Sequence, residues 1–182
     1  LRKTNSSKGG TTLSLAHVLT KACATALKRN PALNTILLNE DILGFDEVNV
    51  GVAVALTDGL IVPVVRNADD KSIEEIATET NDLADRAKAG TLNPDEVLGG
   101  TFTISVLGVV DGFTPILNSG QSAILGVGRS IEKPVVRNGK VIVREMATVS
   151  LTVDHQVIDG AVASSFMRRL QQLVEHPGSL FK

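Results

Sequence analysis

Hydrophobic and polar positions repeat along this chain with two different periods, and the two periods predict a mixture of helices and strands. Apolar residues spaced three and four apart predict amphipathic helices over residues 13–29, 71–89 and 160–175. Alternating positions and short apolar runs predict strands over residues 33–38, 42–45, 48–56, 60–65, 101–107, 121–131 and 141–153. Strands mixed with helices in this way favour an α/β fold, a two-layer sandwich with a mixed β-sheet.

Turn residues separate these elements. Asn138-Gly139 is a strong signal for a hairpin between the last two strands, and Gly59 permits a tight turn before residues 60–65. Pro63 lacks an amide donor, which predicts an edge position or a bulge for that strand. Residues 109–112 are expected to form a loop.

The periodicity also predicts which side chains face the core. The final helix is expected to bury Val162, Phe166, Leu170 and Val174. In the strand over residues 101–107, Thr101, Thr103 and Ser105 share one polar face, which we expect to be wet. His17 is expected on the solvated face of the first helix, and His176 beside the end of the last.

Length and composition favour a single globular domain. The chain has 182 residues, of which 43% are hydrophobic and 21% are charged, enough for a sizeable core. Residues 1–12 are polar and rich in glycine, so we expect a flexible segment there, followed by one domain over residues 13–182.

Charge and hydropathy argue against several classes of partner. The net charge of −2 provides no basic face for nucleic acid or for an acidic membrane surface. No apolar run approaches the roughly 20 residues of a membrane span, and the first ten residues lack the apolar core of a signal peptide. We therefore expect an intracellular protein without a membrane or nucleic-acid partner.

Cys23 is the single cysteine, which excludes an internal disulfide and a cysteine-based zinc site. Its alanine neighbours predict a small buried residue rather than a nucleophile. The sequence contains no cluster of metal-ligating residues and no glycine-rich phosphate loop, so no metal is expected.

The most informative stretch runs from Val149 to Ala163. Alternation up to Val153 predicts a strand, and helical spacing begins at Val162, so His155 lies where a strand passes into a helix. Such junctions hold a side chain on rigid flanks while leaving it accessible, and imidazole is suited to general base catalysis near neutral pH. From the residues alone, His155 could equally be a polar turn residue, and Asp159 could simply cap the helix.

This stretch resembles the His-x-x-x-Asp-Gly signature of the dihydrolipoyl acyltransferases, which the chloramphenicol acetyltransferases share. The matching residues are Asp154-His155-Gln156-Val157-Ile158-Asp159-Gly160-Ala161. Further stretches resemble the same family in the same order, at residues 48–54, 58–66, 99–105, 113–118 and 123–128. The likeness extends from about Leu13 to Phe181.

The resemblance implies a chloramphenicol-acetyltransferase-like fold and acyl transfer between the dihydrolipoamide thiol and coenzyme A. His155 then corresponds to the general base, and Ser105 to the donor that stabilises the oxyanion. Asp159 matches the acidic position of the signature, with a structural contact to the His155 loop and a helix cap as its expected roles. Acetyl is the expected acyl group, with succinyl and branched-chain groups as alternatives.

The resemblance also implies an assembly. Members of the family form homotrimers, with the histidine and serine of one site on neighbouring chains, and the trimers build cubic or dodecahedral cores of 2-oxoacid dehydrogenase complexes. The C-terminal pair Leu180-Phe181 is consistent with such packing. Family members carry lipoyl and subunit-binding modules upstream, which bind the dehydrogenase and dihydrolipoyl dehydrogenase components. We expect the catalytic domain here to be N-terminally incomplete, without those modules, in the cytoplasm or, in a eukaryote, the mitochondrial matrix.

Several positions depart from the family pattern. Gln156 replaces the usual arginine, Val106 follows the serine, the loop over residues 109–112 is shorter, and Ser119-Gly120 replaces a typical Pro-Pro. These changes leave two alternatives open. One is a stand-alone acetyltransferase acting on a small molecule, and the other is a structural core protein of the same fold with weak activity.

Overall fold

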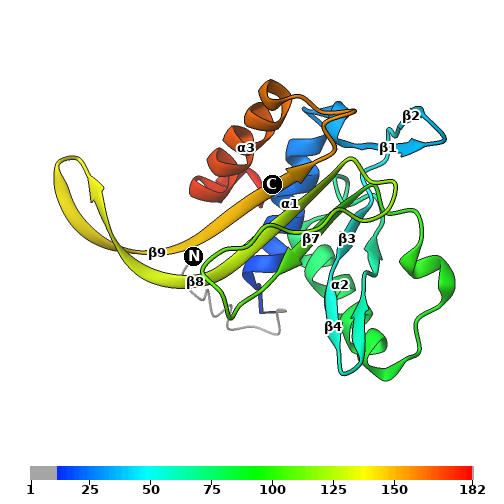
Figure 1. The fold of residues 1–182 in the computed structure, drawn as a ribbon. Coiled ribbons are helices and arrows are strands. Elements are labelled where there is room, and N and C mark those ends of the chain that lie inside the picture. The colour runs from blue at the N-terminus through cyan, green and yellow to red at the C-terminus, as the bar shows by residue number, and fades with distance from the viewer. Residues whose placement is uncertain (1–11, 182) are drawn as a thin grey trace.

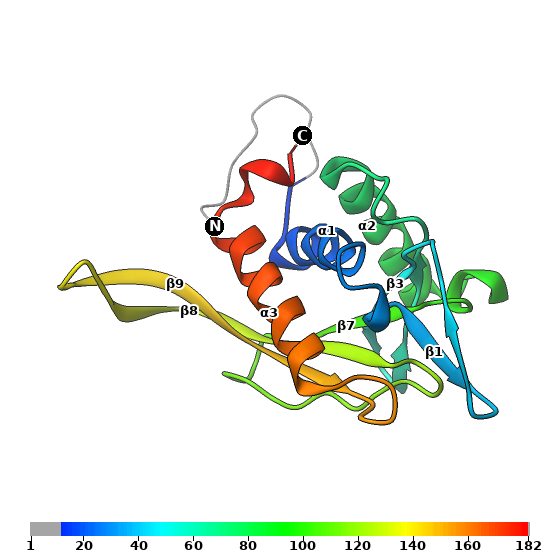
Figure 2. The ribbon, with the colours of Figure 1, turned by 90° about the horizontal axis from the view of Figure 1, so that it is seen from above.

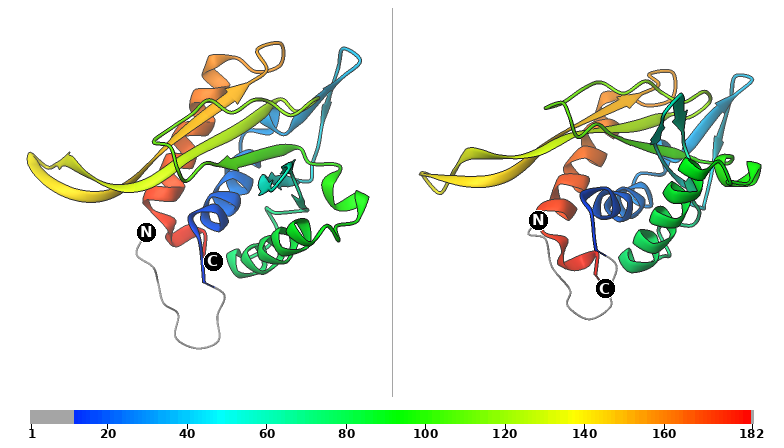
Figure 3. Two further views of the ribbon diagram at one scale, coloured as in Figure 1. Left: turned by 60° about the horizontal axis from the view of Figure 1, so that its bottom comes forward. Right: turned by 90° about the horizontal axis from the view of Figure 1, so that it is seen from below.

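The computed structural model describes residues 12–181, so the flexible segment predicted at residues 1–12 lies almost entirely outside the described range. Within it, helices pack on one face of a mixed sheet (Figures 2 and 3). The helices are α1 (Leu15–Leu27), α2 (Ile73–Ala89) and α3 (Gly160–Glu175). The strands are β1 (Thr35–Leu38), β2 (Asp41–Gly44), β3 (Val50–Val52), β4 (Val54–Leu56), β5 (Gly59–Ile61), β6 (Val64–Val65), β7 (Phe102–Val106), β8 (Ala123–Arg137) and β9 (Lys140–Val153).

Five strands form the main sheet in the order β6-β3-β7-β8-β9. Strand β7 runs parallel to β3 and β8, whereas β6 and β9 are antiparallel to their neighbours. The predicted two-layer α/β fold with a mixed sheet is thereby confirmed. The two short hairpins, β1–β2 and β4–β5, are separate two-stranded sheets. Pro63 precedes the edge strand β6, as its missing amide donor predicted.

The helices cover the apolar face of the sheet. Rows such as Ile104, Leu125 and Leu151 align across β7, β8 and β9 on this face. The ring of Phe102 packs against that of Phe166 in α3, with 5.6 Å between the ring centroids. Since Phe102 and Phe166 are fully buried, they join the sheet to the last helix.

The prediction for the buried face of α3 is partly wrong. Phe166, Leu170 and Leu173 are buried, whereas Val162 and Val174 are only half-buried. Residues spaced i, i+4 and i+7 form a narrow stripe on a helix, and the stripe that starts at Phe166 ends at Leu173.

The N-terminus of α1 corrects the expectation for His17. Its side chain is 4% exposed, not solvated, because it takes part in a capping box. The Ser14 hydroxyl accepts a hydrogen bond from the His17 amide, and His17 Nδ1 accepts one from the Ser14 amide at 3.1 Å. A second hydrogen bond joins His17 to Asn81 of α2. His17 therefore ties the start of α1 to the neighbouring helix.

Strands β8 and β9 continue past the helices as a projecting two-stranded arm (Figure 1). A β-bulge between Val127 and Ser130 marks the start of the arm. Further out, Glu132 pairs directly with Glu145, and Lys133 with Arg144. Like charges directly opposite each other destabilise a strand pair. The arm is held instead by its backbone hydrogen bonds and aliphatic pairs, and by an ion pair between Arg137 and Glu175 of α3.

Across residues 12–181, the helices are all too short or too polar to cross a membrane.

The capping box predicts a dependence of stability on pH. Burial lowers the pKa of His17 below its ordinary value, despite the opposing hydrogen bond to Asn81. The unfolded chain therefore binds the proton more readily, and this contribution to stability is complete above about pH 6.5. It is lost as the pH falls through the lowered pKa of the folded state. We expect the midpoint temperature of thermal unfolding to decrease when the pH is lowered from 7.5 to 5.5.

His17→Gln is the matched variant, because glutamine can accept the same hydrogen bond but does not titrate. Its thermal midpoint should change less over the same interval, which calorimetry at several pH values measures. Equal slopes for both proteins would show that His17 is not the titrating group.

Candidate functional site

His155 lies in the turn between β9 and α3, where the sequence pattern placed it, and its side chain is exposed. Asp154 anchors this turn. Its amide donates to the Ser122 carbonyl at the start of β8, and its carboxylate accepts from the Gln156 amide at 2.9 Å. The Asp154 carbonyl accepts from the amides of Val157 and Ile158. The backbone on both sides of His155 is thus fixed while its imidazole stays accessible.

Asp159 forms the N-cap of α3. Its Oδ1 accepts a hydrogen bond from the Val162 amide at 2.9 Å, as the capping prediction required. Ile158, the residue before it, is 1% exposed and belongs to the core. The turn is therefore pinned at its far end by a buried side chain and a helix cap.

Ser105 lies near the end of β7, on the face of the sheet opposite the helices, and it is half-buried. Its register partner in β8 is Gly126, which in turn pairs with Ser150 of β9. Side chains in register share a face, so Ser105, Gly126 and Ser150 form one row across three strands. The segment between β7 and β8 crosses the sheet at this row, where Pro115 lies against Gly126 and the Phe113 carbonyl accepts from Ser150.

Two glycines of β8 allow that segment to approach closely. A Cβ at Gly126 would lie 2.8 Å from Pro115 Cδ, and one at Gly128 would lie 2.2 Å from the Asp111 carbonyl oxygen. The hydroxyls of Ser150 and Thr152 donate to the carbonyls of Phe113 and Pro115, respectively. The two hydroxyls therefore hold residues 107–118 against β9, and the absence of a side chain at Gly126 and Gly128 lets the same segment lie close to β8.

Two of the three polar residues predicted to be wet are buried, so that prediction is wrong except at Ser105, which is half-buried. Thr101 and Thr103 are 2% and 1% exposed, respectively. The Thr103 hydroxyl donates to Gln121 Oε1 at 2.7 Å and accepts from Asn118 Nδ2 at 2.8 Å. Gln121 also donates to the Gly100 carbonyl. Sequence alternation revealed the polar face, but no local signal revealed the later segment that covers it.

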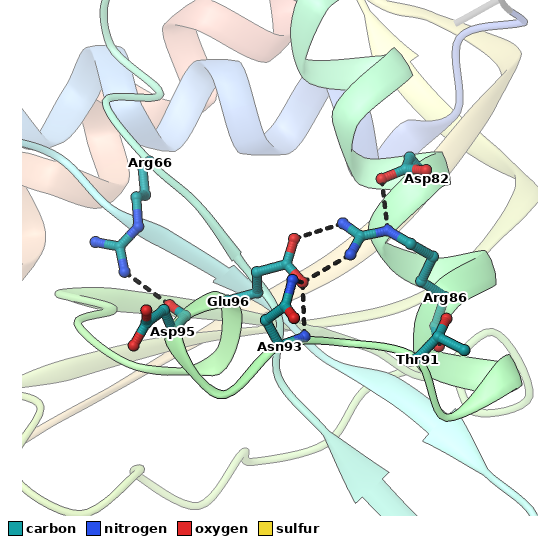
Figure 4. A network of polar contacts seen from close by, with 7 residues as sticks. All are labelled: Arg66, Asp82, Arg86, Thr91, Asn93, Asp95 and Glu96. Carbon is teal, nitrogen blue, oxygen red and sulfur yellow. Dashed lines mark hydrogen bonds and ion pairs between the residues drawn. The ribbon is translucent and has the colours of Figure 1, made fainter.

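The segment that leads into β7 is fixed by a polar network (Figure 4). Arg86 of α2 forms a two-pronged ion pair with Glu96, with nitrogen–oxygen distances of 2.7 and 2.5 Å. Hydrogen bonds from Arg86 and from the Asn93 amide lower the pKa of Glu96 to about 2. Arg66 donates to the carbonyls of Asp95 and Leu98. These contacts set the path of the chain just before the strand that holds Ser105.

The sheet register keeps Ser105 and His155 of one chain apart. Ser105 is two strands away from β9, and His155 follows Ser150, the β9 residue level with Ser105, by five residues. Strand spacing of about 4.8 Å and a rise of about 3.3 Å per residue place Val153, the last residue of β9, about 14 Å from Ser105. His155 lies two residues further on, so it is on the order of 15 Å from Ser105. Within residues 12–181, neither side chain hydrogen-bonds to another protein group.

No group of three or more potential metal ligands occurs in the described part of the chain. Cys23 is fully buried, and burial raises the pKa of its thiol, as expected for a core residue.

Comparison with known proteins identifies the family. The family model "2-oxoacid dehydrogenases acyltransferase (catalytic domain)" matches residues 1–182. This chain belongs to that acyltransferase family. It is 41% identical over 175 residues to the succinyltransferase component of the mitochondrial 2-oxoglutarate dehydrogenase complex 1 of Arabidopsis thaliana. It is also 41% identical over 172 residues to the acetyltransferase component of the Staphylococcus aureus pyruvate dehydrogenase complex.

The acyltransferase chain covers only part of these relatives. The alignments include 95% and 92% of this chain but 38% and 40% of the Arabidopsis and Staphylococcus proteins, respectively.

Solved structures confirm the predicted fold. The cubic core of a pyruvate dehydrogenase multienzyme complex matches with a TM-score of 0.87 and 40% identity, over 95% of this chain and 73% of that one. The Azotobacter vinelandii dihydrolipoamide acetyltransferase matches with a TM-score of 0.88 and 39% identity over the same shares. A chloramphenicol acetyltransferase shares the fold, at a TM-score of 0.54 and 16% identity over 92% of this chain and 77% of that one.

Gly128→Ala should displace the segment that covers the Ser105 row. The added methyl group would overlap the Asp111 carbonyl, and overpacking of this kind costs about 1–3 kcal/mol in the free energy of unfolding. Chemical denaturation measures the loss. Gly108→Ala in the same segment is the control, because its Cβ would meet nothing within 4 Å. If both variants were equally stable, the close contact at Gly128 would not constrain the segment.

Proposed function

We propose that this chain catalyses transfer of an acyl group, most simply acetyl, between coenzyme A and the thiol of a dihydrolipoyllysine residue. The observation that supports this most directly is the exposed His155 on a firmly anchored turn, within a family match that spans the chain. The catalytic mechanism of the Azotobacter relative has been investigated through a serine, a histidine and an asparagine four positions after that histidine. Ser105, His155 and Asp159 are the proposed counterparts here.

In the proposed mechanism, His155 acts as the general base. A thiol with a pKa near 8.5 is only a few per cent ionised at pH 7, so attack on a thioester needs a base within hydrogen-bond reach. An imidazole nitrogen of His155 takes the thiol proton as the sulfur–carbon bond forms. The same proton then returns to the departing thiolate when the tetrahedral intermediate collapses. No net proton is consumed.

Ser105 is the proposed donor to the oxyanion. As the thiolate attacks, the thioester carbonyl oxygen gains negative charge, which a positioned hydroxyl stabilises. The Ser105 hydroxyl is free of protein partners within residues 12–181 and lies beside the segment held on Gly126 and Gly128. It is not acylated in this scheme, because its hydrogen bond alone performs the role.

A complete site needs two copies of the chain. Ser105 and His155 of one chain are on the order of 15 Å apart, whereas a base and an oxyanion donor must each lie about 3 Å from the reacting atoms. The sheet register therefore favours a site in which His155 of one copy faces Ser105 of a neighbour. A cyclic homotrimer provides three such sites through one repeated contact.

Larger assembly is also part of the proposal. One relative of known structure is the cubic core of a multienzyme complex. For this chain we propose trimers that assemble into a cubic or dodecahedral core, with the dehydrogenase components bound through further modules. An intracellular location follows from the use of coenzyme A, and the Arabidopsis relative is mitochondrial.

Asp159 is proposed to position the His155 turn. Its cap on α3 uses one carboxylate oxygen, and an asparagine side chain offers an equivalent oxygen, so the counterpart in the Azotobacter relative can serve the same purpose. Sequence similarity does not distinguish an acetyl from a succinyl substrate, since the acetyltransferase and succinyltransferase relatives are equally similar to this chain.

His155→Ala should lower transfer of acetyl from acetyl-CoA to dihydrolipoamide by about 10² to 10⁴, the usual value of a general base. Ser105→Ala should lower it by about 10² to 10³. Both variants should keep the oligomeric state, which light scattering measures alongside the rate. An unchanged rate in His155→Ala would exclude the proposed base. Transfer only to a small alcohol or amine would favour a stand-alone acetyltransferase, and an inactive parent protein would favour the structural role.

Mixing the two variants separates a shared site from a site within one chain. If they are unfolded and reassembled together in equal amounts, about a quarter of the sites in random trimers combine an intact His155 with an intact Ser105. About a quarter of the parent activity should return. No recovery would place both residues of a site on one chain.

Asp154→Ala should reduce kcat about tenfold or more while leaving KM for both substrates nearly unchanged, because misplacing a base slows chemistry without weakening binding. Asp154→Asn retains the oxygen that accepts the Gln156 amide and should recover most of the rate. The kinetic constants are measured by steady-state kinetics, and the thermal midpoints of the parent protein and both variants are measured alongside them. A lower kcat at an unchanged thermal midpoint indicates a positioning role and not a general loss of stability. Equal rates in the Ala and Asn variants would contradict it.

A further inference from the structure

An open, basic depression lies between the end of α1 and the middle of α3. Its lining residues are Arg29, Asn30, Ser165, Arg168, Arg169 and Gln172. Three are arginines and none carries a carboxylate. The net charge of the chain is −2, so this concentration of positive charge is a local feature against an acidic background.

The three guanidinium groups lack partners in the described chain. Within residues 12–181, none of these three arginines forms an ion pair or a side-chain hydrogen bond. By contrast, Arg86 and Arg129 are both paired with carboxylates. Three unpaired cations around one depression repel one another, and an anionic surface placed over them would remove that repulsion.

The position of the depression relates it to His155. Its α3 residues, from Ser165 to Gln172, are spaced i, i+3, i+4 and i+7 and so form one stripe along the helix. At 1.5 Å per residue, this stripe covers the region about 7 to 18 Å from the start of α3 at Gly160. The His155 turn lies immediately before that start. A partner bound on the stripe would therefore be close to the proposed base.

The chemistry of the acceptor calls for such a docking surface. The relatives are named for a dihydrolipoyllysine residue, a group carried on a protein, so the acceptor thiol arrives with a protein surface around it. We propose that the basic depression of Arg29, Arg168 and Arg169 docks an acidic surface of this carrier protein. The inference rests on the proposed function and names where its protein substrate binds.

Charge and shape support this occupant over a small anion. An acidic carrier is repelled by the average surface of a chain of net charge −2 and attracted to this basic depression, which steers its approach. Arg29, which follows the end of α1, and Arg168 of α3 are both exposed, so they present an open contact area, not an enclosed phosphate pocket. A protein face can cover such an area and exclude water from it.

Arg168→Glu in the assembled protein tests the proposal. The donor is acetyl-CoA, and the two acceptors are a reduced, lipoylated carrier domain with an acidic surface and free dihydrolipoamide. At low salt, kcat/KM for the carrier domain should fall about tenfold, and the difference should shrink as salt screens the charges. The value for free dihydrolipoamide should stay within about twofold, because that acceptor is neutral and has no protein surface.

Arg144→Glu is the matched control. Arg144 is exposed on the β8–β9 arm, and its replacement changes the net charge by the same amount while placing a carboxylate opposite Lys133. It should leave both kcat/KM values nearly unchanged. An equal loss with both acceptors in Arg168→Glu, an equal loss in Arg144→Glu, or no loss with the carrier would each overturn the docking proposal.

Two other outcomes would each lead to a different conclusion. Saturable binding of inorganic phosphate to the depression, without any effect of Arg168→Glu on the carrier, would identify a phosphate site and overturn the proposal. Absence of transfer to either acceptor by the unaltered protein would refute the proposed function itself, and with it the docking inference.

Discussion

The close approach of residues 107–118 to β8 is the contact on which the rest of the candidate site depends. Gly126 leaves room for the ring of Pro115 and Gly128 for the backbone at Asp111, and the hydroxyls of Ser150 and Thr152 hold the crossing segment from β9. As a result, β8 is covered on both faces, by helices on one side and by this segment on the other. Ser105 lies at the margin of that cover, which leaves its hydroxyl half-exposed instead of buried.

The two halves of the candidate site are built in different ways. His155 depends on local structure, because Asp154 and Asp159 fix its turn within a few residues. Ser105 depends on long-range structure, since β7 is placed by its parallel neighbours and by the segment that follows it. Because each half sits on its own scaffold and the register separates them, the two side chains do not meet within one chain, which is why the proposed site draws them from two copies.

Much of this fold follows from periodicity. The three helices, the long β8–β9 hairpin and the strand-to-helix junction at His155 each have a local signature, and each was predicted. The end of β8 was placed six residues too early, at residue 131 instead of Arg137. The errors concern burial. His17 and Thr103 are polar and local patterns place them at the surface, but segments distant in sequence cover them: α2 in the first case and residues 113–121 in the second. Burial of a polar group depends on a partner that periodicity does not identify. Ser105 was assigned from its resemblance to a family, since an isolated serine in an alternating strand has no chemical signature of its own.

The packing of α3 against α1 has a consequence for how the protein is made. These helices stand at opposite ends of the described chain, yet Phe166 and Leu170 of α3 belong to the same core cluster as Leu19 and Ala26 of α1. During synthesis, α1 leaves the ribosome more than a hundred residues before α3, so the part of its apolar surface that α3 covers stays without its partner until α3 has been made. That surface must therefore stay protected over this interval, and loss of α3 would leave α1 without one of its main packing partners.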